Sequence, residues 1–170
     1  EYPSVVQKVT YLGAKHLNEE ELNQLTMVAK GKPLSPITNK LGCQAIVRRY
    51  NEQGRPFASC DLLKGGEPGD TEVVFNITEG PLVKVRSIQF KGQQFVSGPG
   101  LGTHIQSSKK ILGVFGGTYN AALADADVMK LEEYYKGHGF LDVHVSRELT
   151  WTQDGKEVDL VFHIKEGVRY

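Results

Sequence analysis

Two of the five histidines and both cysteines have types and positions that could bind a metal. His144 and His163 are expected on the same face of neighbouring strands, where two imidazoles could share an ion, but no third ligand accompanies them at a suitable spacing. Cys43 and Cys60 lack the paired spacing of a zinc-binding CxxC motif. We therefore predict no metal site, and we interpret the histidines as solvated or paired across strands.

Carboxylates and glycines are the other residues that could form a site. One predicted helix carries Asp125, Asp127, Glu132 and Glu133. No nucleophile or cleft accompanies these acids, so a solvated helix face is a better interpretation than acid–base pairs. The glycines of residues 97–102 lack the strand-to-helix context of a dinucleotide site, which favours a surface loop. We predict no catalytic residue, no cofactor and no enzyme activity.

The composition is that of an ordinary soluble globular protein, with 39% hydrophobic residues. Its 20 basic residues balance its 20 acidic ones, so no net charge favours nucleic acid or an anionic membrane as a partner. No apolar run approaches the ~20 residues of a membrane-spanning helix, and the first residues carry no pattern of a signal peptide. If the protein is exported, we expect its signal to lie outside this sequence.

Three motifs occur twice and divide the sequence into two similar halves. An alternating strand pattern closes on glycine, a helix ends in Tyr-x-x-x-Gly, and a strand ends in Glu-Gly. The copies keep the same order and lie about 80 to 90 residues apart, as a duplicated domain requires. They are Val9–Gly13 and Ile88–Gly92, Tyr50–Gly54 and Tyr135–Gly139, and Phe75–Gly80 and Phe162–Gly167.

Helical periodicity separates the first motif from the second. A helix is predicted to begin at Asn18, where Glu21 completes a capping-box-like pattern, and another is predicted to begin near Pro36. In the second half a long helix is predicted from Asn120, whereas the Gly-rich stretch 97–118 gives no clear counterpart of the first helix. Each half therefore follows the order strand, helix, helix, strand, strand.

Alternating apolar residues predict a hairpin at the end of each half. In the second half, Val143, Val145, Leu149 and Trp151 are expected opposite Ile164, Phe162, Leu160 and Val158. Arg147 shares that inner face, where its stem is expected to lie along apolar surface. In the first half, Ala58, Cys60 and Leu62 are expected opposite Val73, Phe75 and Ile77.

These elements predict an α+β fold of two tandem small domains, each with a three-stranded mixed sheet covered on one face by two helices. The predicted boundaries are 1–80 and 81–167, with 168–170 as the start of a following unit. We expect this last segment because the Glu-Gly exit of the second domain is followed by residues like those after the first. The natural protein is therefore expected to continue into another unit or a barrel.

The repeated order, with its Tyr-x-x-x-Gly helix end and Glu-Gly strand exit, resembles the POTRA domain family over nearly the whole chain. The stretch Arg55-Pro56-Phe57-Ala58 is similar to the strand entry common in that family. Arg55 departs from the pattern, because the family usually has an aromatic residue there, as Phe140 is in the second half. The resemblance implies a periplasmic arm of an outer-membrane assembly or translocation protein of the BamA superfamily, with a parent chain anchored by a barrel.

The resemblance also implies that partner chains bind by strand addition to the edge of each sheet, which in the family is the second strand. The sequence agrees, because Val74 and Val161 make the third strands apolar on both faces, as central strands are. The implied binding residues are Phe57, Ala58, Ser59, Cys60, Asp61, Leu62 and Leu63, and Val143, His144, Val145, Ser146, Arg147 and Glu148. The alternative is an edge that binds nothing.

Cys43 and Cys60 are expected to be neighbours, because one lies on the inner face of its helix and the other on the inner face of its strand. In an oxidising periplasm such a pair can form a disulfide. Two separate buried thiols are the favoured alternative, because free cysteine packs well as a small apolar side chain.

The leading functional hypothesis is a module that binds periplasmic accessory subunits and guides unfolded outer-membrane protein substrates to a membrane-embedded barrel. A second hypothesis is a docking module of a two-partner secretion or cell-division protein, although the duplication argues against the cell-division form. A third is an enzyme, which would need a pocket of convergent polar residues that the sequence does not indicate.

Overall fold

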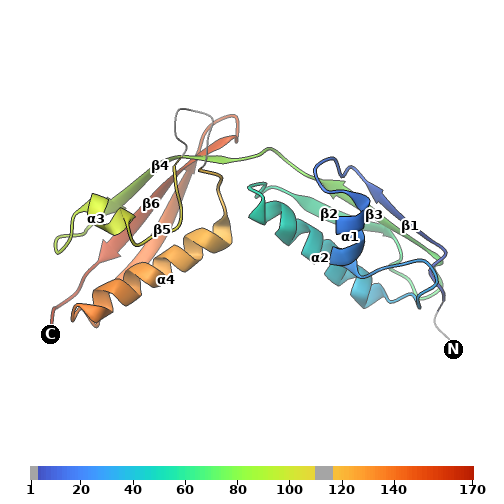
Figure 1. Ribbon diagram of the computed structural model, residues 1–170, viewed down its shortest axis with the longest axis horizontal. Coiled ribbons are helices and arrows are strands. Elements are labelled where there is room, and N and C mark those ends of the chain that lie inside the picture. The colour runs from blue at the N-terminus through green and yellow to red at the C-terminus, as the bar shows by residue number, and fades with distance from the viewer. Residues whose placement is uncertain (1–3, 110–116) are drawn as a thin grey trace. The chain divides into compact units, whose positions relative to one another are not determined.

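The computed structural model describes residues 4–109 and 117–170, and the chain divides into two compact units (Figure 1). Unit 1 comprises residues up to 51 together with 57–80, and unit 2 comprises 52–56 together with 81–170. In each unit a three-stranded mixed sheet has its helices against one face. The α+β class and the order of elements that the sequence predicts are confirmed.

Unit 1 contains β1 (Lys8–Leu12), α1 (Glu19–Thr26), α2 (Pro36–Glu52), β2 (Ser59–Lys64) and β3 (Glu72–Thr78). β3 is the middle strand, parallel to β1 and antiparallel to β2. The predicted start of α1 is confirmed, because Asn18 Oδ1 accepts a hydrogen bond from the Glu21 amide at 2.9 Å. The apolar face of α2 packs on the sheet through buried Ile46 and Tyr50.

Unit 2 contains β4 (Lys84–Lys91), α3 (Gly98–Gly102), α4 (Ala121–Gly137), β5 (His144–Trp151) and β6 (Glu157–Lys165). β6 is the middle strand, parallel to β4 and antiparallel to β5. Of the predicted hairpin pairs, Leu149 with Leu160 and Trp151 with Val158 are confirmed. The other two are wrong, because Val143 precedes β5 and Arg147 fills the inner face: Ile164 pairs with Val145, and Phe162 pairs with Arg147.

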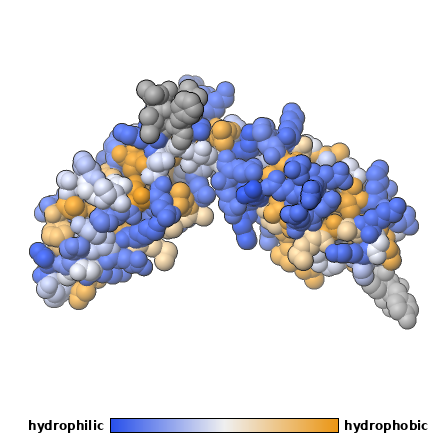
Figure 2. Space-filling view, viewed as in Figure 1, coloured by the Kyte–Doolittle hydropathy of each residue, from blue (hydrophilic) through white to orange (hydrophobic). Residues whose placement is uncertain are grey.

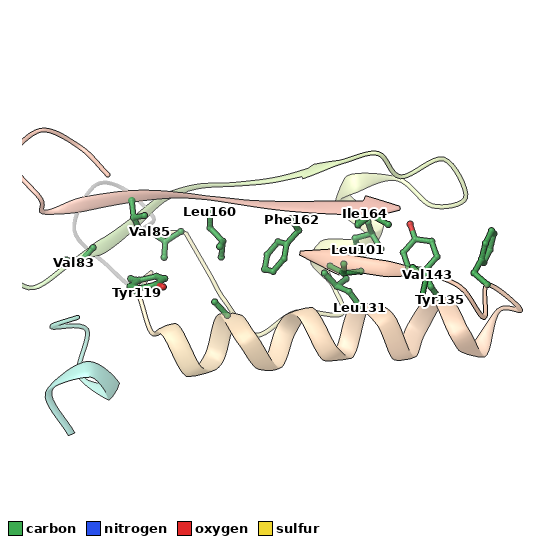
Figure 3. Close-up of a cluster of buried hydrophobic side chains, with 14 residues drawn as sticks. Val83, Val85, Leu101, Tyr119, Leu131, Tyr135, Val143, Leu160, Phe162 and Ile164 are labelled. Atoms are coloured by element: carbon green, nitrogen blue, oxygen red, sulfur yellow. The ribbon is translucent and has the colours of Figure 1, made fainter. Parts of the chain in front are cut away.

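The core of unit 2 forms where one stripe of α4 meets one face of β6. Figure 3 shows Leu131 and Tyr135 pointing from the helix toward Leu160, Phe162 and Ile164 on the strand. The helix residues are four apart and the strand residues two apart, which are the spacings that keep side chains on one face of each element. These five side chains are at most 5% exposed. Burying such large apolar groups stabilises the unit by about 1.5–3 kcal/mol each.

The two units differ where the first helix of each should lie. In unit 1 the Gly42 position of α2 lies against Thr26 of α1, with no room for a larger side chain. The matching residue of α4 is Asp127, which is fully buried and accepts the amides of Gln106 and Ser107, both at 2.7 Å. Unit 2 has the short α3, capped by Ser97, where unit 1 has the longer α1, and the loop after α3 is held by the Asp127 carboxylate. The prediction of a surface loop over residues 97–102 is therefore wrong, because Leu101 of this short helix is buried in the core. Of the Gly-rich stretch 97–118, residues 110–116 lie outside the described residues.

The prediction that the acids of this helix are solvated is wrong for Asp127. Its two oxygens accept backbone amides of the loop, and burial of a carboxylate is tolerated only with such hydrogen-bond donors. Asp125, whose side chain is 63% exposed, faces solvent but pairs with Arg147. Glu132 is partly buried beside β5.

A buried carboxylate joins three segments of unit 1. Glu79, at the exit of β3, is 9% exposed. Its Oε1 accepts the amides of Lys15 and His16 at 2.6 and 2.8 Å and the hydroxyl of Tyr50 at 2.8 Å. The His16 ring lies 2.6 Å from Oε2. The loop after β1, the end of α2 and the exit of β3 are thereby fixed together.

The same arrangement recurs in unit 2. Glu166 Oε1 accepts the amides of Gln94 and Phe95 at 2.7 and 2.9 Å and the hydroxyl of Tyr135 at 2.9 Å. The three repeated sequence motifs therefore meet at one point in each unit. We call this point the carboxylate clamp: Glu79 with Tyr50 in unit 1, and Glu166 with Tyr135 in unit 2.

The glycine that ends the first strand of each unit is required by the clamp. Gly13 has a positive φ of 82°, and a Cβ there would collide with the Ile77 carbonyl of the neighbouring strand. Gly92 has a φ of 90° and meets the Ile164 carbonyl in the same way. Only glycine adopts this backbone while lying so close to the central strand.

The clamp changes the ionisation of its groups. Burial alone would raise the pKa of Glu79, but the hydrogen bonds from Lys15, His16 and Tyr50 outweigh it and lower the pKa to about 2. The pKa of Glu166 is lowered in the same manner. Burial, with donation to Glu166, raises the pKa of the Tyr135 hydroxyl. Folding therefore stabilises the ionised form of each clamp carboxylate.

We predict that Glu79→Gln destabilises unit 1 by about 2–3 kcal/mol at neutral pH, because two amides and a hydroxyl lose a charged acceptor. Folding lowers the pKa of Glu79 from 4.5 to about 2, so the wild-type contribution is complete above the unfolded-state pKa and is lost as the pH falls from about 5 to about 2. Denaturant unfolding at several pH values, followed by amide hydrogen exchange of unit 1, measures both effects.

The control is Glu67→Gln, which changes an exposed carboxylate in the β2–β3 loop of the same unit. Its stability should follow the wild type at every pH. Equal stability of Glu79→Gln and wild type at neutral pH would contradict the clamp.

Candidate functional site

The outer strand β2 of unit 1 and β5 of unit 2 carry the residues that the sequence predicts for partner binding. Both strands are at an edge, since among the described residues each pairs with the central strand of its sheet and with no other. The predicted stretches are wrong at their starts, because Phe57, Ala58 and Val143 precede the strands. Turns at 56–57 and 141–142 occupy the chain there, so pairing begins at Ser59 and His144.

The β2 edge lies beside a groove between α2 and the strand. The groove has a volume of about 380 Å³ and is lined by Cys43, Gln44, Val47, Arg48, Asn51 and Cys60. The pairs Cys60 with Ile77 and Leu62 with Phe75 hold the strand against β3. A bulge then falls at Leu63, whose side chain is 59% exposed. Bulges limit regular pairing at an edge, so Ser59 to Leu62 is the part of β2 suited to another strand.

Cys43 and Cys60 form a disulfide, rather than the two separate thiols that the sequence favoured. Their Cα atoms lie 5.3 Å apart, within the usual range for a bonded pair. The inward parity of both residues was enough to predict contact, but the sequence does not contain the distance between α2 and β2. The bond fixes the edge strand to the helix that forms the other wall of the groove.

The β5 edge is occupied by side chains of α4. Glu132 Oε1 accepts the Val145 amide at 3.0 Å, and the Glu132 carboxylate lies 3.6 Å from both the His144 ring and Lys136 Nζ. The sequence pattern alone did not predict this contact. The signal that could have found it is the position of Glu132 one turn before Tyr135, on the stripe of α4 that faces the hairpin.

Arg147 lies on the inner face of β5, as expected. Its Nε donates to Asp125 at 2.6 Å and its Nη1 donates to the Tyr119 hydroxyl at 3.2 Å. The guanidinium therefore bridges α4 and the segment before it. Its burial is compensated by two acceptors, which is the condition for placing a charge at the margin of a core.

The two histidines of the outer face each pair with a carboxylate. His163 Nε2 lies 2.7 Å from Glu148 Oε2 across the hairpin, and His144 lies near Glu132. Within residues 4–109 and 117–170, no group of three His, Cys, Asp or Glu could hold a metal ion. In the same part of the chain, no helix is both long enough and apolar enough to cross a membrane.

Each sheet also has a second edge, β1 in unit 1 and β4 in unit 2. Beside β1, a groove of about 270 Å³ is lined by Val9, Thr10, Tyr11, Ala14, Leu17, Glu19 and Leu22. The Tyr11 hydroxyl contacts Asn23 and Thr26 of α1 at 3.0 and 2.8 Å. These contacts tie β1 to α1.

A family model described as "POTRA: Surface antigen variable number repeat" matches residues 4–80 and 83–167. A curated protein of Treponema pallidum (strain Nichols), named "Putative outer membrane protein assembly factor", is 25% identical over the whole of this chain. The chain spans 21% of the length of that protein.

Solved structures of similar fold come from several bacteria. The Haemophilus influenzae BamA POTRA3-5 structure is 14% identical with a TM-score of 0.66, covering 98% of this chain and 67% of that one. The POTRA1-2 structure of Omp85 from Anabaena is 15% identical with a TM-score of 0.54, covering 100% and 99%. A Haemophilus ducreyi BamA structure lacking POTRA domains 1-3 is 20% identical with a TM-score of 0.67, covering 97% and 29%.

We predict that reducing the disulfide destabilises unit 1 by about 3 kcal/mol, because the bond joins residues 17 apart and restricts the unfolded chain. Denaturant unfolding with and without dithiothreitol measures the change through unit 1 amide signals. The fluorescence of Trp151, the single tryptophan of the sequence, reports unit 2 and should not respond. The double variant Cys43→Ala/Cys60→Ala is the control, and a reductant effect on that variant would contradict the assignment.

Proposed function

The chain belongs to the POTRA family, and we propose that its two domains are a periplasmic interaction module of an outer-membrane protein assembly or translocation factor. The similar proteins are named as an assembly factor or as POTRA domains of BamA and Omp85. We further propose domain boundaries at 1–80 and 81–167, with 168–170 as the start of a following unit. The parent chain would be anchored by an outer-membrane barrel.

The observation that carries this proposal is the edge strand beside a long helix in each unit. An edge presents unpaired amides and carbonyls, which an extended chain can pair with. Such recognition uses the backbone, so it tolerates many side-chain sequences. We therefore propose unfolded outer-membrane protein substrates as partners, because their segments are destined to become β-strands.

The expected affinity of one edge is low. About four ladder hydrogen bonds contribute about 0.5–1.5 kcal/mol each, against an association cost of about 4–15 kcal/mol. Binding at a single edge is therefore weak and transient. This suits a factor that must pass its substrate to a barrel.

Accessory subunits are the second class of partner that we propose. Hydrophobic side chains are exposed on both units among hydrophilic ones (Figure 2). On α2, Ile37 and Leu41 are 74% and 56% exposed and lie one turn apart on the same side of the helix. Such a stripe can dock a folded partner, which also supports the alternative of a docking module in a two-partner secretion protein.

We predict that an extended peptide copied from an outer-membrane β-strand shifts the amide signals of an edge strand, Ser59–Lys64 or His144–Trp151. The shifts should saturate only at high micromolar to millimolar peptide, because the binding energy is small. ¹H–¹⁵N correlation spectra of the labelled chain provide the measurement. A matched peptide with proline at alternate positions cannot donate to the ladder and should not bind. Shifts on α2 with none on either edge would replace strand addition by helix docking.

A further inference from the structure

The two candidate edges can be compared residue by residue because the domain is repeated. When Tyr50 is aligned with Tyr135, Cys60 corresponds to Val145, and each pairs with an isoleucine of the central strand. Val47 of α2 then corresponds to Glu132 of α4, and Cys43 corresponds to Val128. The backbones of β2 and α2 thus match those of β5 and α4, but the side chains at the matching positions differ.

On the β5 edge, the Val145 amide points away from β6, because it donates to Glu132. Amides of an antiparallel strand alternate in direction, so those of Arg147 and Leu149 point outward as well. An incoming strand needs these donors in succession. Glu132 occupies the first of them with a charged acceptor, and Lys136 and His144 hold the carboxylate from two sides.

On the β2 edge, the matching helix residue is Val47, which cannot accept a hydrogen bond. The repeat places the outward amides of β2 at Cys60 and Leu62. Within residues 4–109 and 117–170, the structure records no side-chain acceptor on either of these amides. The disulfide takes the place of the Val128 and Val145 pair, so the strand is held without using its outward backbone groups.

We infer that strand addition belongs to the β2 edge of unit 1, and that Glu132 closes the β5 edge of unit 2 by binding the amide that a partner strand would need. This inference rests on the proposed function and assigns it to one of the two domains. Glu132 therefore determines specificity by keeping a partner strand away from β5. A partner carbonyl must displace a charge-assisted hydrogen bond to enter β5, whereas no such bond has to be broken at β2.

The β2 groove also indicates the chemistry of its occupant. Its walls are apolar at Val47 and at the disulfide, and its one charged lining residue is Arg48. The occupant is therefore an extended segment with small apolar side chains toward the groove and an acidic side chain opposite Arg48. A neutral or basic residue at that position should bind less well.

The test exchanges the residues between the units. The probe is an acetylated, amidated peptide of about ten residues that alternates valine and threonine and carries one glutamate. In wild type, amide shifts should follow Ser59–Leu62 with little change along β5. In Glu132→Val, β5 affinity should rise about tenfold, and in Val47→Glu, β2 affinity should fall about tenfold, because one charge-assisted hydrogen bond is removed or added.

Two control variants separate closure of the edge from general damage. Glu132→Gln keeps an oxygen that can accept the Val145 amide, so β5 should stay closed. Glu133→Ala changes an exposed neighbour on the same helix and should match the wild type. Trp151 fluorescence and the dispersion of the amide spectrum confirm that each variant is folded. A peptide with lysine in place of glutamate should bind β2 several-fold more weakly.

The outcomes distinguish this inference from the proposed function. Equal shifts along β2 and β5 in wild type, or no gain at β5 in Glu132→Val while β2 still binds, would overturn the role of Glu132 and leave strand addition intact. No shifts at either edge in wild type and Glu132→Val would overturn strand addition itself. Higher peptide affinity at β5 in Glu132→Val, together with lower affinity at β2 in Val47→Glu, establishes that Glu132 closes β5 and that β2 is the open edge.

Discussion

In each unit an ionised carboxylate at the exit of the central strand accepts two backbone amides and a tyrosine hydroxyl. A buried carboxylate without such partners would be strongly destabilising, so the loop after the first strand and the end of the long helix must both reach Glu79 or Glu166. The glycine before that loop follows from the same constraint, since it lets the chain turn against the central strand. Three sequence motifs that are far apart are thus parts of one interaction.

The clamp fixes one side of each unit and leaves the other to separate contacts. It ties the first strand, the helix end and the central strand together, while β2 and β5 pair on the far side of that central strand. A disulfide holds β2 to its helix, and Glu132 and Asp125 hold β5 to its helix. These two solutions stabilise the same packing but leave different backbone groups available. The difference in binding that we infer is a consequence of how each edge is attached.

Sequence reasoning predicted the repeat, the order of elements and the residues that face inward on each hairpin, because period and parity specify them locally. It did not fix the full pairing registers, since the strands begin at Ser59 and His144 and β2 carries a bulge. It did not predict that Gly13, Tyr50 and Glu79 meet, since motif spacing along a chain does not give distances in space. Asp127 was missed for a related reason: its burial depends on the loop that follows α3, and no periodicity marks such a loop. The disulfide needed a distance between α2 and β2 that only packing supplies.

Residues of the carboxylate clamp and residues beside the edge strands tolerate substitution to different degrees. Replacing a clamp residue leaves buried donors without an acceptor, which costs about 2–4 kcal/mol, a large part of the stability of a small domain. Val47 and Glu132 are partly exposed, and exchanging them adds or removes one charge-assisted hydrogen bond to an edge amide, worth about 1.5 kcal/mol, which is less than the loss of a clamp residue. After duplication, the edges could therefore diverge while the clamp stayed the same. A tandem array built in this way can keep one fold and still distribute open and closed edges among its units.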